Sequence, residues 1–562
     1  MLSVLAIFIV IFFISTNLGR TINQILLRDK YKIYGTVDMD IVSGICLCSL
    51  YAQIVSLIGG VGREAFIVIA FLSLILFYVN RASNYYRNFF NGFINLDIKS
   101  KITIFIMLFG VILWSTISPQ HYDTYLYHAQ AIHWIEDFGV VPGLGNLHFR
   151  LAYNSALMPL HALFSFKWIS GQSFHVVNGF FTVFICIYVF NKFIDKKEYA
   201  ISLSDLLGLG AVFYVLYDCS HVSSPNSDTI TLLLVYYVLI KWADYSEKRY
   251  FEVDVYAYLC TILVYLMTFK LSAGILIILT VFPAIELLKG KKYKKIVGYI
   301  GYGIIVLIPF IVRNILISGY LLYPYEKTGI KELEWRVPET TLRQDLAEII
   351  AWGRGNCDVS RNGEYFWQWI PQWFENINIL WRIMFILCII SMVYILVYMI
   401  SRGKEKIKTS YGMLVISCIL GWFFWLFSAP LPRYGTVYMI SLPFIAIDMA
   451  LADFKGRSWN KKIKLMLCSA GRNAYWLLGL LYIVVFWGYV AIFNGEFPDL
   501  VVQGDYYNKD TYSVSDSGVE IAVPITGDQT GYEPFPSTPY VGSAQNIILR
   551  GEDVEDGFKT RY

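Results

Sequence analysis

Apolar blocks of membrane-spanning length recur along the whole chain. Examples are residues 38–58, 101–117, 296–312, 376–399 and 473–494. A helix needs about 20 apolar residues to cross about 30 Å of hydrocarbon, and only helices or closed barrels satisfy their backbone hydrogen bonds there. The blocks lack the period-two alternation of a barrel strand. They therefore predict an all-α polytopic membrane protein.

Composition supports this class and excludes several others. Of the 562 residues, 56% are hydrophobic and only 16% are charged, whereas soluble domains carry about 25% charged residues. The first block, residues 1–15, lacks a basic leader and a small-residue cleavage site, so we expect a retained span. The net charge of +4 forms no nucleic-acid-binding stripe, and the nine cysteines form no metal-spaced pair.

Basic residues alternate between rich and poor loops, which predicts the orientation of the spans. The rich loops are Arg20–Lys32, Arg81–Lys101, Lys192–Lys197, Lys248–Arg249, Lys289–Lys295, Arg402–Lys408 and Lys455–Lys464. Placing them in the cytoplasm predicts about fourteen spans in the cell (inner) membrane, with both termini extracytoplasmic. Residues 153–168 are apolar but short, so we expect a re-entrant or interfacial helix there.

This topology divides the chain into membrane and extracytoplasmic regions. Transmembrane helices are expected in residues 1–118, 172–318 and 374–494, and extracytoplasmic segments in 119–171, 319–373 and 495–562. The segment 319–373 is rich in tryptophan, which suits either sugar stacking or an interfacial belt. The tail from residue 495 contains no span, and we expect short strands there, packed on the loops.

Polar chemistry gathers in the first large loop. All seven histidines lie between His121 and His221, and the simpler explanation for each is contact with headgroups and water. Residues 122–138 have the pattern of a helix lying along the membrane surface. Its predicted common face carries Asp123, Tyr127, Gln130 and Trp134. The simpler explanation for Asp123 is an N-cap of that helix.

Further charged residues stand at the predicted outer ends of later spans. They are Asp228 in SPNSD, Lys270 in TFKLSAG, Arg313 in VRNILISGYLLYP, and Arg433 with Tyr434 in APLPRYG. Charges that border hydrocarbon are costly unless they are paired or used in function. The alternative for each is snorkelling to the interface.

These phrases resemble the GT-C class of membrane glycosyltransferases, such as the protein mannosyltransferase and aminoarabinose transferase families. The resemblance rests on Asp123 in HYDTYLYHAQAI, Asp228, Lys270, the phrase RNILISGYLLYP and the phrase PRYG. More closely, DTYLYHAQAIHW, VPGLGNLHFRLAYNS and the tail phrases GDQTGYEPFPSTPY and LRGEDVEDGF are similar to a group of bacterial multi-span proteins to which we attach no activity. The resemblance runs over most of the chain.

The resemblance implies an inverting transfer of a sugar from a polyprenyl-phosphate carrier to an extracytoplasmic glycan, lipid or protein. Asp123 would be the general base, and Lys270, Arg313 and Arg433 would stabilise the leaving phosphate. Asp228 and His128 would orient the acceptor or hold a divalent cation. The other expected substrate-binding residues are Tyr127, Arg150, Asn154 and Tyr434.

Other functions remain open from the sequence. A lipid-linked saccharide transporter or flippase would use the same rim charges to bind a headgroup, although we find no repeat between the two halves of the chain. A non-catalytic component of a surface-polysaccharide assembly system and an O-antigen-type polymerase or ligase are further alternatives.

Overall fold

The computed structural model describes residues 1–194, 201–247, 252–402, 408–453, 476–477, 479–492, 497–516 and 518–561. Much of the predicted cytoplasmic charge lies outside the described residues. This applies to Lys196, Lys197, Lys248, Arg249, Lys404, Lys406 and Lys455–Lys464. The described chain is mostly helical, as the sequence predicts.

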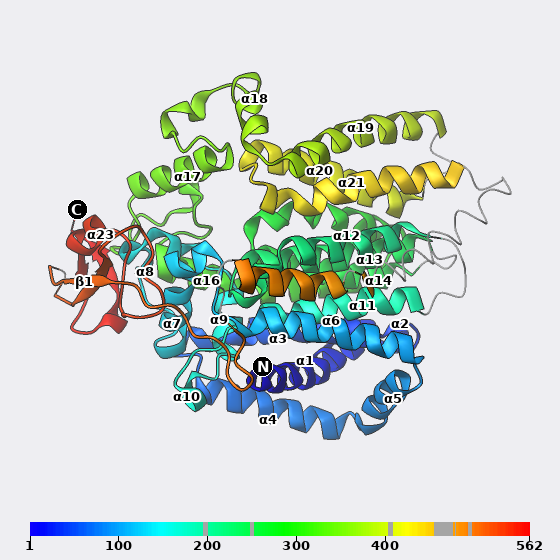
Figure 1. The fold of residues 1–562 in the computed structure, drawn as a ribbon, viewed down its shortest axis with the longest axis horizontal. Coiled ribbons are helices and arrows are strands. Elements are labelled where there is room, and N and C mark those ends of the chain that lie inside the picture. Colours follow the sequence, from blue (N-terminus) through cyan, green and yellow to red (C-terminus); the bar gives the residue numbers. More distant parts are fainter. Residues whose placement is uncertain are drawn as a thin grey trace.

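A bundle of long helices forms the body of the protein, and most of them run side by side along its long axis (Figure 1). Its long helices are α1 (Leu2–Leu27), α3 (Val37–Ser56), α4 (Arg63–Val79), α6 (Ile98–Thr116), α11 (Val177–Ile194), α12 (Leu203–Tyr217), α13 (Ser227–Glu247), α14 (Val253–Phe269), α16 (Tyr293–Ser318), α19 (Ile379–Arg402), α20 (Thr409–Ser428) and α21 (Pro432–Asp453). Shorter pieces are η1 (Arg28–Lys30), α2 (Tyr31–Tyr34), α5 (Ser83–Ile94), η4 (Cys219–Ser223), η5 (Leu271–Thr280) and α15 (Val281–Lys289). A last apolar helix covers Gly479–Ile492.

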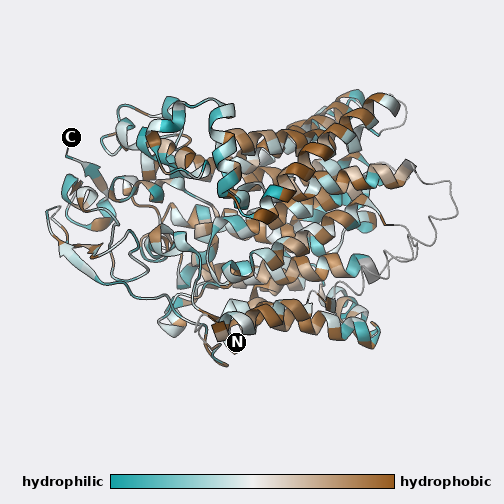
Figure 2. Cartoon of the chain, turned by 45° about the horizontal axis from the view of Figure 1, so that its top comes forward, coloured by the Kyte–Doolittle hydropathy of each residue, from teal (hydrophilic) through white to brown (hydrophobic). Residues whose placement is uncertain are grey.

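Eight helices of the described chain are long and apolar enough to cross a membrane, and a ninth span arises if α4 and α5, bent by 90°, count as one. Four apolar helices are shorter, among them Leu203–Tyr217 and Val253–Phe269. The fold is therefore that of a helical, multi-pass membrane protein, and the count of about fourteen spans stays a prediction. Figure 2 shows hydrophobic colour along most of the bundle and more hydrophilic colour where the loops and the tail gather.

The long loops collect at one end of the bundle (Figure 1). They contain η2 (Thr124–His128), α7 (Ala129–Asp137), α8 (Leu144–Leu147), η3 (Phe149–Tyr153), α9 (Leu157–Leu163), α10 (Lys167–Ser170), η6 (Glu326–Thr328), α17 (Glu339–Gly353), η7 (Val359–Gly363) and α18 (Phe366–Asn376). Because α9 has seven residues, residues 153–168 do not form a spanning helix, in line with the sequence. The N-terminal nitrogen of Met1 donates to the Asp499 carbonyl at 2.8 Å, so α1 starts beside the tail.

The tail folds as a small appendage on the loops. Strand β1 (Thr511–Val514) pairs antiparallel with β2 (Ile521–Pro524), and β3 (Ile547–Leu549) pairs antiparallel with β4 (Phe558–Thr560). Between these two hairpins lies α23 (Val541–Asn546), and η8 (Val554–Asp556) precedes β4. Trp134, Leu147, Val523 and Phe558 share one buried apolar cluster, which joins the tail to the first loop. The expected short strands are confirmed.

Candidate functional site

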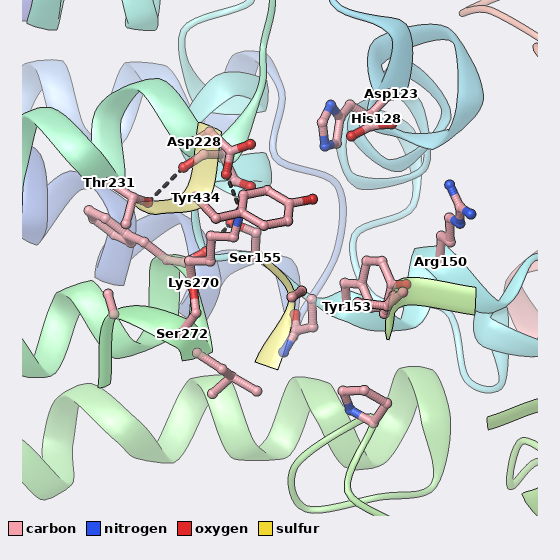
Figure 3. Close-up of a pocket in the computed structure, with 18 of the residues that line it drawn as sticks. Asp123, His128, Arg150, Tyr153, Ser155, Asp228, Thr231, Lys270, Ser272 and Tyr434 are labelled. Atoms are coloured by element: carbon pink, nitrogen blue, oxygen red, sulfur yellow. Dashed lines mark hydrogen bonds and ion pairs between the residues drawn. The ribbon is translucent and has the colours of Figure 1, made fainter. Parts of the chain in front are cut away.

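A cavity of about 520 Å³ lies where the loops meet the bundle (Figure 3). It is lined by every predicted site residue, namely Asp123, Tyr127, His128, Arg150, Asn154, Asp228, Lys270, Arg313, Arg433 and Tyr434. They come from the first loop, the start of α13, the residue after α14, the last turns of α16 and the start of α21. Segments far apart in the sequence therefore meet around one space.

Two carboxylates and two cations form a connected network in this cavity. Lys270 Nζ pairs with Asp228 Oδ1, as Figure 3 shows, and Arg433 Nη2 donates to Asp123 Oδ2 at 3.1 Å. Arg433 Nε also lies 3.8 Å from Asp228 Oδ2, so it bridges the two acids. The Tyr434 ring packs against both cations, with Lys270 Nζ 4.0 Å from its centroid. Charges of both signs are thus held at fixed positions.

Asp123 does not act as the helix cap that the simpler explanation requires. It stands at the N-cap position of η2, yet within the described chain its carboxylate accepts no hydrogen bond from the first backbone N–H groups of that helix. The carboxylate instead turns to Arg433. The sequence position of Asp123 is therefore that of a cap, but its contacts are those of the cavity.

The expected common face of residues 122–138 is wrong, because a π-helical turn over Thr124–His128 interrupts the helix near its start. A π turn contains more residues than an α turn and shifts the phase of everything that follows. Tyr127 lines the cavity with Asp123, whereas the Gln130 side-chain amide donates to the Tyr532 carbonyl of the tail at 2.9 Å. Trp134, 0% exposed, packs on tail residues. The helix is therefore largely covered by other parts of the protein.

Two histidines next to Asp123, His121 and His221, were not among the predicted site residues. His121 Nδ1 accepts the Asp123 backbone N–H at 3.1 Å, and Arg433 Nη1 lies 3.1 Å from His121 Nε2. The His221 ring packs against His121, and its Nδ1 lies 2.7 Å from Asp218 Oδ1. The histidine cluster in the sequence was the available signal for His121, but nothing local marks Asp218.

Electrostatics keep Asp123 ionised. Burial alone would raise its pKa, but the electrostatic interactions with the His121 ring and the Arg433 guanidinium outweigh this effect and hold the pKa below its usual value. Burial lowers the pKa of His121 to about 3 and that of His128 to about 4, so both rings are neutral at neutral pH. At neutral pH the positively charged neighbour of Asp123 is therefore the guanidinium of Arg433.

Arg313 and Arg150 differ from the other two cations. Arg313 is 1% exposed, donates from Nε to Asn154 Oδ1 at 2.8 Å, and also bonds Ser56 Oγ. Arg150 is 5% exposed, stacks over the Trp352 ring at 4.8 Å, and has a buried Nε without a partner. Within the described ranges no carboxylate oxygen lies within 4.0 Å of a nitrogen of either guanidinium. Such burial is not snorkelling, because a snorkelling side chain reaches water.

Aromatic side chains complete the cavity. Of the tryptophans in residues 319–373, only Trp352 lines it, while Trp373 is buried against Trp425 and Phe385. The described residues contain no group of three metal-ligating side chains, and both cavity carboxylates face cations. The donor set therefore does not fit a divalent ion.

Comparison with known proteins gives a family and no activity. No curated protein and no solved structure is significantly similar to this chain. One family model matches residues 1–440, which include every predicted site residue and exclude the tail. The chain therefore belongs to the family described as "Domain of unknown function (DUF8201)".

Proposed function

We propose that this protein is a membrane glycosyltransferase that moves a sugar from a polyprenyl-phosphate carrier to an extracytoplasmic acceptor, with inversion at the sugar. The observation that carries the proposal is the cavity itself, in which an ionised carboxylate stands beside several fixed cations. Proton removal needs the carboxylate, and a leaving phosphate needs the cations. The resemblance to GT-C enzymes in the same residues points to the same reaction.

Asp123 is the better candidate for the base. Asp228 already pairs with Lys270 and lies near Arg433. Among the described residues, Asp123 has Arg433 at 3.1 Å as its charged partner, since the His121 ring, 4.0 Å away, is neutral. In the proposed step, Asp123 takes the proton of the acceptor hydroxyl while that oxygen bonds to the anomeric carbon. The bond from this carbon to the phosphate oxygen breaks, and the polyprenyl phosphate leaves with the electron pair.

The leaving phosphate is best served by Arg313, with Arg150 as a second contact. Both guanidiniums line the cavity and lack a carboxylate partner among the described residues, whereas Lys270 and Arg433 are already neutralised. A planar guanidinium can bind phosphate through two parallel hydrogen bonds. Lys270 and Arg433 then orient the two acids and supply a weaker positive field.

The rest of the cavity suits a sugar on a lipid carrier. Tyr127, Tyr153 and Trp352 offer aromatic faces of the kind that stack on sugar rings. Phe424 and Val437, on α20 and α21, add apolar lining of the kind a polyprenyl chain needs. The expected partners are thus membrane lipid, the donor, and a glycan, lipid or protein acceptor.

The proposed location is the extracytoplasmic side of the cell membrane, with both termini on that side. The short helices α2 and α5 lie at the end of the bundle opposite the loops (Figure 1), and η1 and α2 contain Arg28, Lys30 and Lys32. Basic residues favour the cytoplasm. Exposed Cys357, in the tryptophan-rich segment, is a natural reporter of the other side.

Thiol labelling of intact cells tests this orientation. We expect a membrane-impermeant reagent to label Cys357 and a cysteine at Tyr540, and to spare cysteines at Phe90 and Gly290 until the cells are opened. Labelling of the variants Phe90→Cys and Gly290→Cys but not of Cys357 would reverse the topology and remove the proposed reaction.

The reaction itself is tested in membranes with a polyprenyl-phosphate sugar donor, by following release of polyprenyl phosphate and the appearance of a glycosylated acceptor. A wild-type protein that moves the intact donor across the bilayer without cleaving it would support the transporter alternative. A protein that binds the donor but does neither would support the non-catalytic alternative.

A further inference from the structure

The C-terminal tail forms hydrogen bonds with the helical turn that carries Asp123. Thr530 and Gly531 both donate their backbone N–H to the Tyr125 carbonyl, each at 2.9 Å. On the other side of Asp123, the Gln529 side-chain amide donates to the Tyr122 carbonyl at 3.1 Å, and the Tyr122 hydroxyl donates to Asp528. The segment Asp528–Tyr532, called the tail clamp here, therefore bonds to residues on both sides of Asp123.

The clamp bonds to a carbonyl that the π turn makes available. In an α-helix the Ala129 N–H would bond to the Tyr125 carbonyl, four residues back. It bonds instead to the Thr124 carbonyl, five residues back. The two N–H groups of the clamp occupy the Tyr125 carbonyl in its place. The tail thus satisfies a backbone group that the unusual turn would otherwise leave to other partners.

The turn decides where the carboxylate lies. π turns are rare and are found mostly at functional sites. Here the turn allows Tyr127 to line the cavity with Asp123, while Gln130, one turn later, reaches the tail with hydrogen bonds from its amide to the Gly531, Tyr532 and Pro534 carbonyls. A regular α-helix through the same residues would rotate one of these two groups away from its partners.

We infer that the tail clamp is a positioning element for the candidate base: it holds the π turn at Tyr125 and so keeps the Asp123 carboxylate against Arg433. In its catalytic consequence this inference rests on the proposed function, whereas its structural part stands without it. The clamp lies outside residues 1–440, which the family model matches, so the site draws on a second part of the chain.

The test uses variants of the full-length protein. Asp528→Ala with Gln529→Ala removes both side-chain contacts to Tyr122 and leaves the fold of the tail intact, because neither side chain is buried. Thr530→Pro is the stronger variant, since proline has no N–H to donate to Tyr125. Glu552→Ala with Glu555→Ala is the matched control, with two exposed acids of the tail replaced away from the clamp.

The first readout is hydrogen exchange of the peptide that covers residues 121–130. We expect exchange to rise about tenfold in both clamp variants, the worth of one or two lost hydrogen bonds, and to stay unchanged in the control. Unchanged exchange in both clamp variants would overturn the inference. Because this readout needs no activity, it remains valid even if the wild-type protein transfers no sugar. Absence of sugar transfer would contradict the proposed function but not the structural role of the clamp.

The second readout is the split between kcat and KM for sugar transfer. A displaced base lowers kcat by about tenfold to a hundredfold and leaves the KM for the donor unchanged, because the phosphate contacts at Arg313 are untouched. Loss of folded protein would instead lower the amount of active enzyme, which titration of donor-binding sites reveals. Raised exchange with wild-type kcat would overturn the positioning role.

Discussion

The four cations of the cavity fall into two pairs that are neutralised differently. Lys270 and Arg433, the paired cations, face Asp228 and Asp123. Arg313 and Arg150, the unpaired cations, are more deeply buried and contact only neutral groups among the described residues. The sequence does not distinguish the two pairs, because all four residues stand at predicted span ends or in the first loop.

The difference assigns separate tasks to the two pairs. An ion pair whose members stay together contributes to holding segments of the fold in place, and removing one partner leaves the other charge uncompensated. A buried cation without an anion is costly unless a ligand supplies the negative charge. The paired cations therefore hold segments of the site together, and the unpaired cations are the ones that we propose for binding an anion.

Exchange of the two cavity acids for amides gives the largest expected effect. We expect Asp123→Asn to lower sugar transfer by about 10²-fold to 10⁴-fold, because an amide cannot take the acceptor proton. The melting temperature should change little, since Arg433 keeps Asp228 as a partner. Turnover in membranes and thermal unfolding of purified protein measure the two quantities.

The matched variant is Asp228→Asn, which removes the carboxylate that neutralises Lys270. It should lower the free energy of unfolding by about 1–3 kcal/mol, less than for fully buried pairs because the Lys270 side chain is 26% exposed. Wild-type turnover in Asp123→Asn would reject Asp123 as the base and favour a transporter or a non-catalytic protein.

Removal of one cation from each pair gives a smaller and more selective effect. We expect Arg313→Met to raise the KM for the donor by about tenfold to a hundredfold, the worth of a charged hydrogen bond to phosphate. Its free energy of unfolding should be unchanged or higher, because a buried unpaired charge is lost. Donor titration and denaturant unfolding measure both changes.

Lys270→Met is the comparison variant, and it should lower the free energy of unfolding more than it weakens donor binding. It leaves Asp228 with the more distant Arg433 alone, so stability falls while donor binding changes less. If Arg313→Met unfolds the protein and binds donor normally, Arg313 is a structural cation and the division into two pairs fails.

Much of the site was predictable because polar residues in apolar surroundings are rare and therefore informative. Asp228, Lys270, Arg313 and Arg433 each stand near the end of a hydrophobic segment, and their shared predicted side implied a common layer. That layer became one cavity in the structure. Helix class likewise followed from block length and low charge.

The remaining features depend on contacts that a linear pattern does not contain. The π turn at Thr124–His128 breaks the 3.6-residue period on which the face of Asp123 and Trp134 was predicted. Its partner is the tail, about 400 residues away. Which cation meets which acid is equally non-local, since Arg433 and Asp123 are 310 positions apart.

The smallest expected effect concerns Asp345, a buried acid that interacts electrostatically with Arg150. Asp345 is 0% exposed and accepts the Tyr153 hydroxyl at 2.7 Å, and Tyr153 lines the cavity. Burial raises the pKa of Asp345 to about 6, although the charge of Arg150 opposes this shift. Asp345 is therefore ionised at pH 7.5 and largely protonated at pH 5, whereas His121, His128 and His148, with pKa values of about 3 to 4, stay neutral throughout.

Protonation of Asp345 removes a negative charge near Arg150, so the affinity for the donor should rise as the pH falls from 7.5 to 5. The proposed donor is a phosphodiester, whose charge does not change in this range. We expect a few-fold effect, since one charge pair across a hydrated cavity is worth about 1 kcal/mol or less. Asp345→Asn should bind at pH 7.5 as the wild type does at pH 5, and lose the pH dependence. It should also be more stable than the wild type at pH 7.5 and lose this advantage as the pH falls towards 4, because a carboxyl whose pKa is raised on folding loses stability between its unfolded pKa, about 4, and its folded pKa, about 6. If the pH dependence of donor affinity persists in Asp345→Asn, another group near the unpaired cations titrates in this range. The proposed effect of Asp345 on Arg150 would then be wrong.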